Sequence, residues 1–132
     1  MHNHGIHWIA DRSLKIQTLS LIFQCKSRLS HYHGQILNYA ELGRSFGDED
    51  LYFWHTHAGA ELDLFWQAGG KSWGMEFKYE DAPRLTRSMK AAFEDLSLER
   101  LWVIYPGNTA YRLAEKVQVM PLADISDTWR YE

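Results

Sequence analysis

The stretch GAELDLFWQAGGKSWGMEFKY, residues 59–79, decides the fold. Two runs that mix apolar and polar residues flank the pair Gly69-Gly70. A two-residue Gly-Gly loop is a strong signal for a β-hairpin, because the favoured turns need positive φ angles. With this pair as the turn, large apolar residues face one another on one side, which we predict to be the core face. These pairs are Trp66 with Trp73, Leu64 with Met75, and Leu62 with Phe77.

The other side of the same hairpin carries charges. In this register Asp63 faces Glu76, and Glu61 faces Lys78. Directly opposed residues have Cβ atoms roughly 4.5–5.5 Å apart. Two carboxylates at that distance repel by about 1 kcal/mol in water and by about 4 kcal/mol at an effective dielectric near 20. A sheet with a purely structural role gains nothing from this repulsion.

Two partners could offset the repulsion: the ammonium group of Lys78 and a divalent cation between the acids. Carboxylate oxygens suit Mg²⁺ or Mn²⁺, which proteins often hold with one or two carboxylates plus water and phosphate oxygens. A lysine beside such a metal could orient a water or stabilise charge on a phosphate. The alternative is a half-solvated sheet face with its charges pointing outward, which is very common.

The composition indicates the broad class of protein. The chain has 132 residues, 45% of them hydrophobic, which predicts one folded domain with a real core. A formal charge of -3 means that nucleic-acid binding would need a local basic patch. The single cysteine, Cys25, fits a reducing cytoplasm, and no apolar run is long enough to span a bilayer. We therefore expect a cytoplasmic protein without a membrane partner.

The rest of the chain predicts an α/β fold with one mixed sheet flanked by helices. We expect a poorly classified segment at 1–34, divergent or disordered and with a frayed end at Met1–Trp8, a domain at 35–125 and a tail at 126–132. Within the domain, periodicity and turn residues indicate helices and strands in a defined order. The expected helices are 35–46 and 82–100, and the expected strands are 51–58, 61–68, 71–79, 101–107 and 114–125.

Asp63 on one strand, followed by Glu76-x-Lys78 on the next, resembles the PD-(D/E)xK nuclease signature. More narrowly, four segments between Arg44 and Ile125 resemble the uncharacterised C-terminal domain of predicted AAA+ family ATPases, a domain considered PD-(D/E)xK-like. The segments are DLYFWHTHAGAELDLFW, GGKSWGMEFKYEDAPRLTRSMKAAFEDL, LERLWVIYPG and VQVMPLADI. The resemblance implies a restriction-endonuclease-like core with a three-stranded antiparallel meander.

The resemblance also implies roles for single residues. Asp63 and Glu76 would be metal ligands for Mg²⁺ or Mn²⁺, and Lys78 would be the catalytic lysine. Three further residues are accessory candidates. Glu61 matches an acid that usually precedes the motif aspartate, Glu41 is the candidate for an added helix glutamate, and His57 fits the family's text. The sequence contains no phosphate-binding Gly-Lys-Ser/Thr loop, so an ATPase would enter only as a partner.

Two further groups have alternative interpretations. His55 and His57 could form a second metal pair on one face of the strand at 51–58, or they could be ordinary strand and turn histidines. Arg84, Arg87 and Lys90 have helical spacing, and they could contact phosphates or form a solvated helix face.

These residues support two functional hypotheses. One is a Mg²⁺-dependent nuclease acting on DNA or RNA. The other is a non-catalytic domain that docks protein or nucleic acid.

Overall fold

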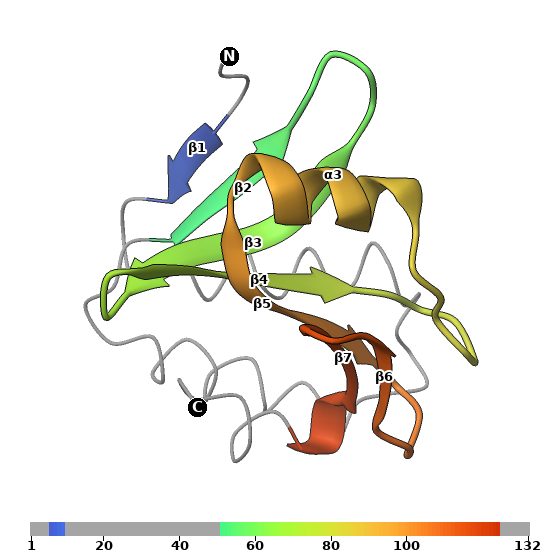
Figure 1. Cartoon of the computed structure of the whole chain (residues 1–132). Helices are drawn as coiled ribbons and strands as arrows, with labels where there is room; N and C mark the ends of the chain where they lie inside the picture. The colour runs from blue at the N-terminus through green and yellow to red at the C-terminus, as the bar shows by residue number, and fades with distance from the viewer. Residues whose placement is uncertain (1–5, 10–50, 125–132) are drawn as a thin grey trace.

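The computed structural model describes residues 6–9 and 51–124 (Figure 1). Within these residues the chain forms one mixed sheet of seven strands, in the order β1-β2-β3-β4-β5-β7-β6. One α-helix and one short 3₁₀ helix complete the described part. The strands are β1 (Ile6–Ile9), β2 (Leu51–His55), β3 (Glu61–Ala68), β4 (Lys71–Phe77), β5 (Leu98–Tyr105), β6 (Tyr111–Ala114) and β7 (Val117–Pro121), and the helices are α3 (Arg87–Asp95) and η2 (Leu122–Asp124).

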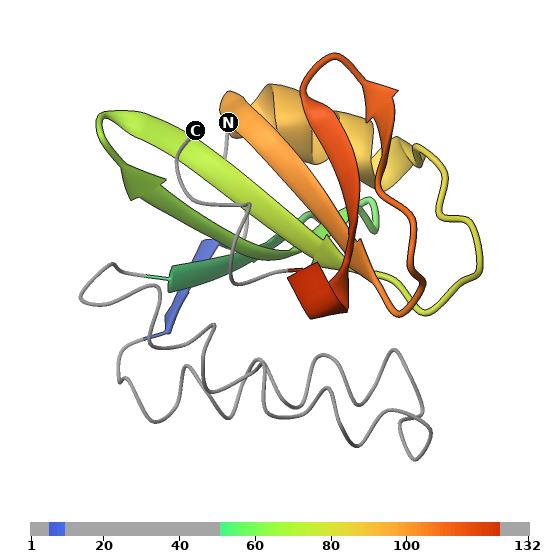
Figure 2. The same cartoon turned by 90° about the horizontal axis from the view of Figure 1, so that it is seen from below.

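The sheet has an antiparallel half and a parallel half. Strands β1 to β4 form an antiparallel meander, whereas β4, β5 and β7 run parallel, and β6 pairs antiparallel with β7 at one edge. Helix α3 is the crossover between β4 and β5, and it lies on one face of the sheet (Figures 1 and 2). The prediction of an α/β fold with a mixed sheet is confirmed. The expected helix at 35–46, with Glu41, lies outside the described residues.

The Gly-Gly turn forms as predicted. Gly69 and Gly70 have φ angles of 63° and 77°, the left-handed values that a primed two-residue turn requires. Trp66 pairs with Trp73 and Leu64 with Met75, so the hairpin register is confirmed from the turn as far as these residues.

Beyond Leu64 and Met75 the regular β3–β4 pairing ends, and the predicted pair of Leu62 with Phe77 is wrong, because these residues lie in different apolar clusters. On its other side, against β2, strand β3 contains a β-bulge. Tyr52 of β2 pairs with Phe65, but Trp54 pairs with Leu62, so two residues of β3 face one residue of β2. A bulge of this kind bends the strand and redirects its side chains. Leu62 therefore packs with Trp54 and Phe65 on the opposite side of the sheet from Leu64.

Two apolar clusters cover the two faces of the sheet. The cluster on the face away from α3 contains Trp66, Trp73, Phe77 and Trp102, all of which the pattern predicts to be core. The indole rings of Trp66 and Trp102 stack with centroids 6.3 Å apart. The other cluster lies under α3, and Gly74 is part of its floor: a Cβ there would come within 2.8 Å of Leu98.

Helix α3 begins later than the sequence suggests. Its N-cap is Thr86, whose hydroxyl accepts a hydrogen bond from the main-chain N–H of Met89 at 3.1 Å. A threonine at this position satisfies one of the donors that a helix start leaves without a partner. The expected apolar face does pack on the sheet, with Met89 and Ala92 buried and with Leu85, Phe93 and Leu96 partly buried.

The ends of the sheet also differ from expectation. Residues 6–9 pair with β2, although we expected Met1–Trp8 to be an exposed end. The short last strand expected within 114–125, before a tail, is β7, which η2 follows. The short edge strand β6 precedes it. No helix in the described part of the chain is long and apolar enough to cross a membrane.

Candidate functional site

Asp63 and Glu76 are the buried charged residues of the described part of the chain. Asp63 lies in the bulge of β3 and is 8% exposed, and Glu76 lies near the end of β4 and is 4% exposed. Glu76 pairs with Val103 of β5, which belongs to the cluster under α3. Buried carboxylates are costly unless charges or hydrogen bonds compensate them. The surroundings of this pair must therefore supply such compensation.

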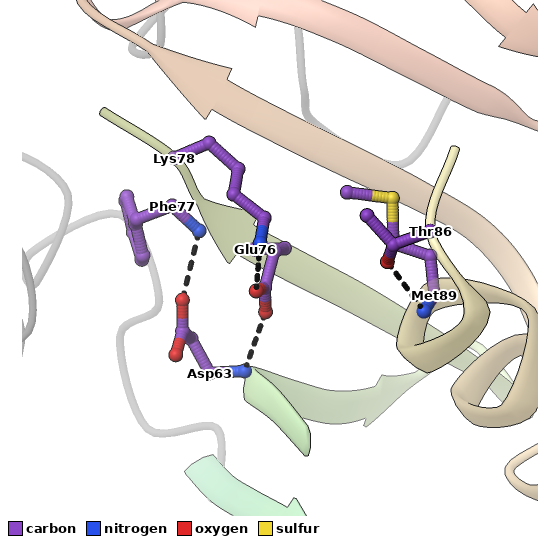
Figure 3. A network of polar contacts seen from close by, with 6 residues as sticks. All are labelled: Asp63, Glu76, Phe77, Lys78, Thr86 and Met89. Atoms are coloured by element: carbon purple, nitrogen blue, oxygen red, sulfur yellow. Dashed lines mark hydrogen bonds and ion pairs between the residues drawn. The ribbon is translucent and has the colours of Figure 1, made fainter. Parts of the chain in front are cut away.

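Main-chain N–H groups supply part of the compensation for burying the two carboxylates. The N–H of Asp63 donates to Glu76 Oε1 at 3.1 Å, and the N–H of Phe77 donates to Asp63 Oδ2 at 2.9 Å (Figure 3). Each acid thus accepts a hydrogen bond from the opposite strand, at the point where the regular β3–β4 pairing stops at Leu64 and Met75. The structure brings the two acids together through these contacts rather than through simple cross-strand pairing.

Lys78 supplies a positive charge beside Glu76. Its Nζ lies 3.7 Å from Glu76 Oε2, and its side chain is 23% exposed (Figure 3). The main-chain N–H of Lys78 donates to the carbonyl of Ile104 at 2.8 Å, which holds the residue against β5 just after β4 ends. A partly buried ammonium group at this distance favours the charged carboxylate. Asp63, Glu76 and Lys78 therefore form one polar group, which we call the acid–lysine cluster.

The accessory candidates lie at the edge of the acid–lysine cluster or outside it. Glu61 is exposed and pairs with His55 across β2 and β3. The regular β3–β4 pairs stop at Leu64 and Met75, so they do not include the expected pair of Glu61 with Lys78. His57 lies in the turn after β2 and is exposed, so it does not share a strand face with His55. Among the described residues, no group of three or more His, Cys, Asp or Glu could hold a metal ion together.

The basic candidates lie around the start of α3. Arg87 and Lys90 are exposed residues of the helix, whereas Arg84 is exposed but precedes the N-cap. The three residues therefore do not share one helical face, as the spacing suggested. Arg100 contacts the ring of Trp102, with its guanidinium carbon 6.0 Å from the ring centroid. It lies on the sheet face away from α3.

Sequence reasoning missed the bulge and the main-chain donors of the acid–lysine cluster. Residues 62–66 are apolar apart from Asp63, a pattern typical of a strand that is buried on both faces rather than solvated on one. This pattern does not show where a bulge lies. The pattern of residue types does not predict the hydrogen bonds between the two acids and the main chain.

The comparisons with known proteins place the chain in a family. Residues 35–125 match the family described as domain of unknown function DUF4143, and the chain belongs to this family. It is 36% identical over 88 residues to the uncharacterized protein Rv2008c of Mycobacterium tuberculosis, and equally to Mb2031c of Mycobacterium bovis. The match covers 67% of this chain and 20% of each relative, so it spans one fifth of their length. No solved structure matches the chain significantly.

Proposed function

We propose that the acid–lysine cluster is a Mg²⁺- or Mn²⁺-dependent site that hydrolyses phosphodiester bonds in nucleic acid. The observation that carries the proposal is the burial of two carboxylates, Asp63 and Glu76, on neighbouring strands with Lys78 beside them. The resemblance of these three residues to the PD-(D/E)xK signature points the same way. The family itself, described only as a domain of unknown function, adds no activity to this argument.

The residues fit a small hard cation. Both acids are carboxylates, which supply the hard oxygen ligands that Mg²⁺ and Mn²⁺ prefer. Mg²⁺ is commonly bound through one or two carboxylates and takes its other ligands from water and phosphate. Asp63 and Glu76 would hold the ion. When bound, the ion would neutralise charge on the phosphate and lower the pKa of a coordinated water.

The other residues would act on the substrate. Lys78 would orient the attacking water and stabilise negative charge that develops on the phosphate oxygens. Arg84, Arg87 and Lys90, all exposed, would contact phosphates along the strand and make binding dependent on salt. Glu61 at the start of β3 and His57 in the turn before it are exposed and would be accessory groups.

A metal titration with matched variants tests the proposal. Mn²⁺ binding to the purified chain is measured by calorimetry, and cleavage of DNA and RNA is measured with and without Mg²⁺ or Mn²⁺. We expect one Mn²⁺ site that Asp63→Asn and Glu76→Gln abolish, while Glu94→Gln, at an exposed acid of α3, retains it. Absence of both Mn²⁺ binding and metal-dependent cleavage in the unaltered chain would overturn the proposal.

A second candidate is a domain that binds protein or nucleic acid without cutting, as a module of an ATPase or with an ATPase partner. The specific observation in its favour is that the main-chain hydrogen bonds give both acids a structural role. Unchanged partner binding in the double variant Asp63→Asn, Glu76→Gln, together with no cleavage by the unaltered chain, would favour this candidate. The activity and partners of the longer relatives, and a cytoplasmic location, remain proposals for this chain.

A further inference from the structure

A hollow lies directly beyond Lys78, where the parallel strands β4 and β5 end. It has a volume of about 290 Å³ and is lined by Tyr79, Glu80, Asp81, Pro106 and Gly107. Sites at the carboxyl ends of parallel strands are common ligand positions in α/β sheets. The volume lies just below the range of roughly 300–1,000 Å³ that drug-sized ligands occupy, so it suits a single ring system. We call this feature the Tyr79 hollow.

Its lining combines a flat aromatic surface with a rigid wall. Tyr79 is 37% exposed, which makes it one of two large exposed apolar side chains in the described residues; the other is Phe53 at 38%. The wall at Pro106 and Gly107 is held by Tyr105, whose hydroxyl donates to the carbonyl of Thr109 at 2.7 Å and accepts from its N–H at 3.0 Å. A Cβ on Gly107 would come within 2.3 Å of the Tyr105 ring, so this turn packs tightly on it.

The charged residues around the Tyr79 hollow predict how a nucleotide would be oriented in it. Glu80 and Asp81 are exposed acids, which accept hydrogen bonds and repel phosphate. Lys78 is the neighbouring cation, one residue before Tyr79. With the cation of the proposed function held by Asp63 and Glu76, a nucleotide bound here would have its phosphate toward the acid–lysine cluster and its base in the hollow.

We propose that the Tyr79 hollow binds an unpaired nucleobase that carries an exocyclic amino group, stacked on Tyr79, with the amino group donating to Glu80 or Asp81. Aromatic side chains bind single-stranded bases by stacking, and acidic side chains accept from the amino group of cytosine. The proposal rests on the proposed function for the position of the phosphate. It adds a substrate class, namely single-stranded or end-frayed nucleic acid in which a base can leave its pair.

The test is binding with Ca²⁺ in place of Mg²⁺ and Mn²⁺, so that the carboxylates can hold a cation while the metals of the proposed cleavage are absent. Fluorescence anisotropy is measured with labelled single strands of about eight nucleotides, a length within the site sizes of such proteins. Oligodeoxycytidine and oligothymidine are compared, because both bases are single rings and only cytosine has the amino group. We expect tighter binding of oligodeoxycytidine.

Variants separate stacking from hydrogen bonding. Tyr79→Ala should weaken binding about tenfold, Tyr79→Phe should retain it, and Phe53→Ala, an equally exposed aromatic elsewhere, should leave it unchanged. In the double variant Glu80→Gln, Asp81→Asn the preference for cytosine over thymine should shrink, and the ratio of affinities is the measured quantity. Circular dichroism checks that each variant folds.

Equal binding by Tyr79→Ala and the unaltered chain, or an equal loss in Phe53→Ala, would overturn the proposal. Different results would contradict the base site and the proposed nuclease function. A chain that binds through Tyr79 but never cleaves with Mg²⁺ or Mn²⁺ contradicts only the nuclease proposal. A chain that cleaves but binds independently of Tyr79 contradicts only the base site.

Discussion

The main-chain N–H of Asp63 donates to Glu76 Oε1 at 3.1 Å, so the residue proposed as one metal ligand also orients the other. The N–H of Phe77 returns a hydrogen bond to Asp63 Oδ2 at 2.9 Å. These two contacts continue the connection between β3 and β4 beyond the last regular pair. The acids therefore contribute both to the fold and to the proposed site.

Removing a carboxylate should cost stability as well as metal binding. Asp63→Ala leaves the buried N–H of Phe77 without its acceptor, and loss of a buried partner costs about 1–3 kcal/mol. Asp63→Asn keeps an acceptor oxygen and should lose less. Urea unfolding of both variants measures the difference. Equal stability of Asp63→Ala and the unaltered chain would show that the carboxylate does not support the hairpin.

Lys78→Met should separate metal binding from cleavage. The ammonium group lies 3.7 Å from Glu76 Oε2 and competes electrostatically with a cation at the same carboxylates. We expect Mn²⁺ to bind at least as tightly as before, while cleavage falls by about 10²-fold or more, because a preorganised charge is lost. Calorimetry and a single-turnover assay measure the two effects. Weaker Mn²⁺ binding in this variant would contradict the assigned role, and Lys71→Met, at the far end of β4, is the control.

Gly74→Ala should destabilise the sheet under α3. The new Cβ would lie 2.8 Å from Leu98 Cδ1, 3.1 Å from Leu62 Cδ2 and 3.3 Å from Leu101 Cδ1. Overpacking of a core typically costs about 1–3 kcal/mol. Thermal unfolding measures the loss, with Ser72→Ala on the same strand as the control. A variant as stable as the unaltered chain would mean that the three leucines move aside at no cost.

Thr86→Ala should weaken the start of α3. The hydroxyl of Thr86 accepts from the N–H of Met89, and loss of such an N-cap costs about 1 kcal/mol. Thr86→Ser keeps the hydroxyl and should behave like the unaltered chain in denaturant unfolding. Indistinguishable stability of the alanine and serine variants would exclude a capping role.

Tyr111 should make stability fall at alkaline pH. Burial raises the pKa of this phenol above its ordinary value of 10.0, with smaller contributions from Tyr105 and Glu80. The folded state therefore holds the proton more firmly than the unfolded state. The contribution of Tyr111 to the free energy of unfolding is therefore complete below about pH 10. It is lost as the pH rises through the raised pKa. Unfolding measured against pH, compared with Tyr111→Phe, checks it; identical alkaline profiles would contradict the prediction.

The sequence predicts the local elements better than their connections. The Gly69-Gly70 turn specifies the adjacent pairs because few residues adopt positive φ and because large apolar residues must share a face. The crossover helix is predictable from the spacing of Met89, Ala92 and Phe93. The bulge is not predictable from alternation, since an inserted residue changes the side on which Leu62 packs without changing its type.

For the site, the residue types and the hairpin predict that Asp63 and Glu76 lie near each other, and Lys78 follows from its position directly after β4. The hydrogen bonds that these acids accept from the main chain could not be read from the sequence. They depend on where the regular pairing of two strands ends, which the bulge in β3 determines. The prediction that Arg84 lies on the helix is wrong, because Thr86 caps the helix after it, and a capping residue interrupts a periodicity that otherwise looks continuous.

The bulge in β3 has a consequence for comparing members of this family. Asp63 and Glu76 help to join two strands, so a relative that has lost all chemistry would still be under pressure to keep them. The side chain of Lys78 contributes a charge but does not join two strands. Under the proposed function, the lysine, rather than the acids, is therefore the position at which members that lose the activity should diverge first.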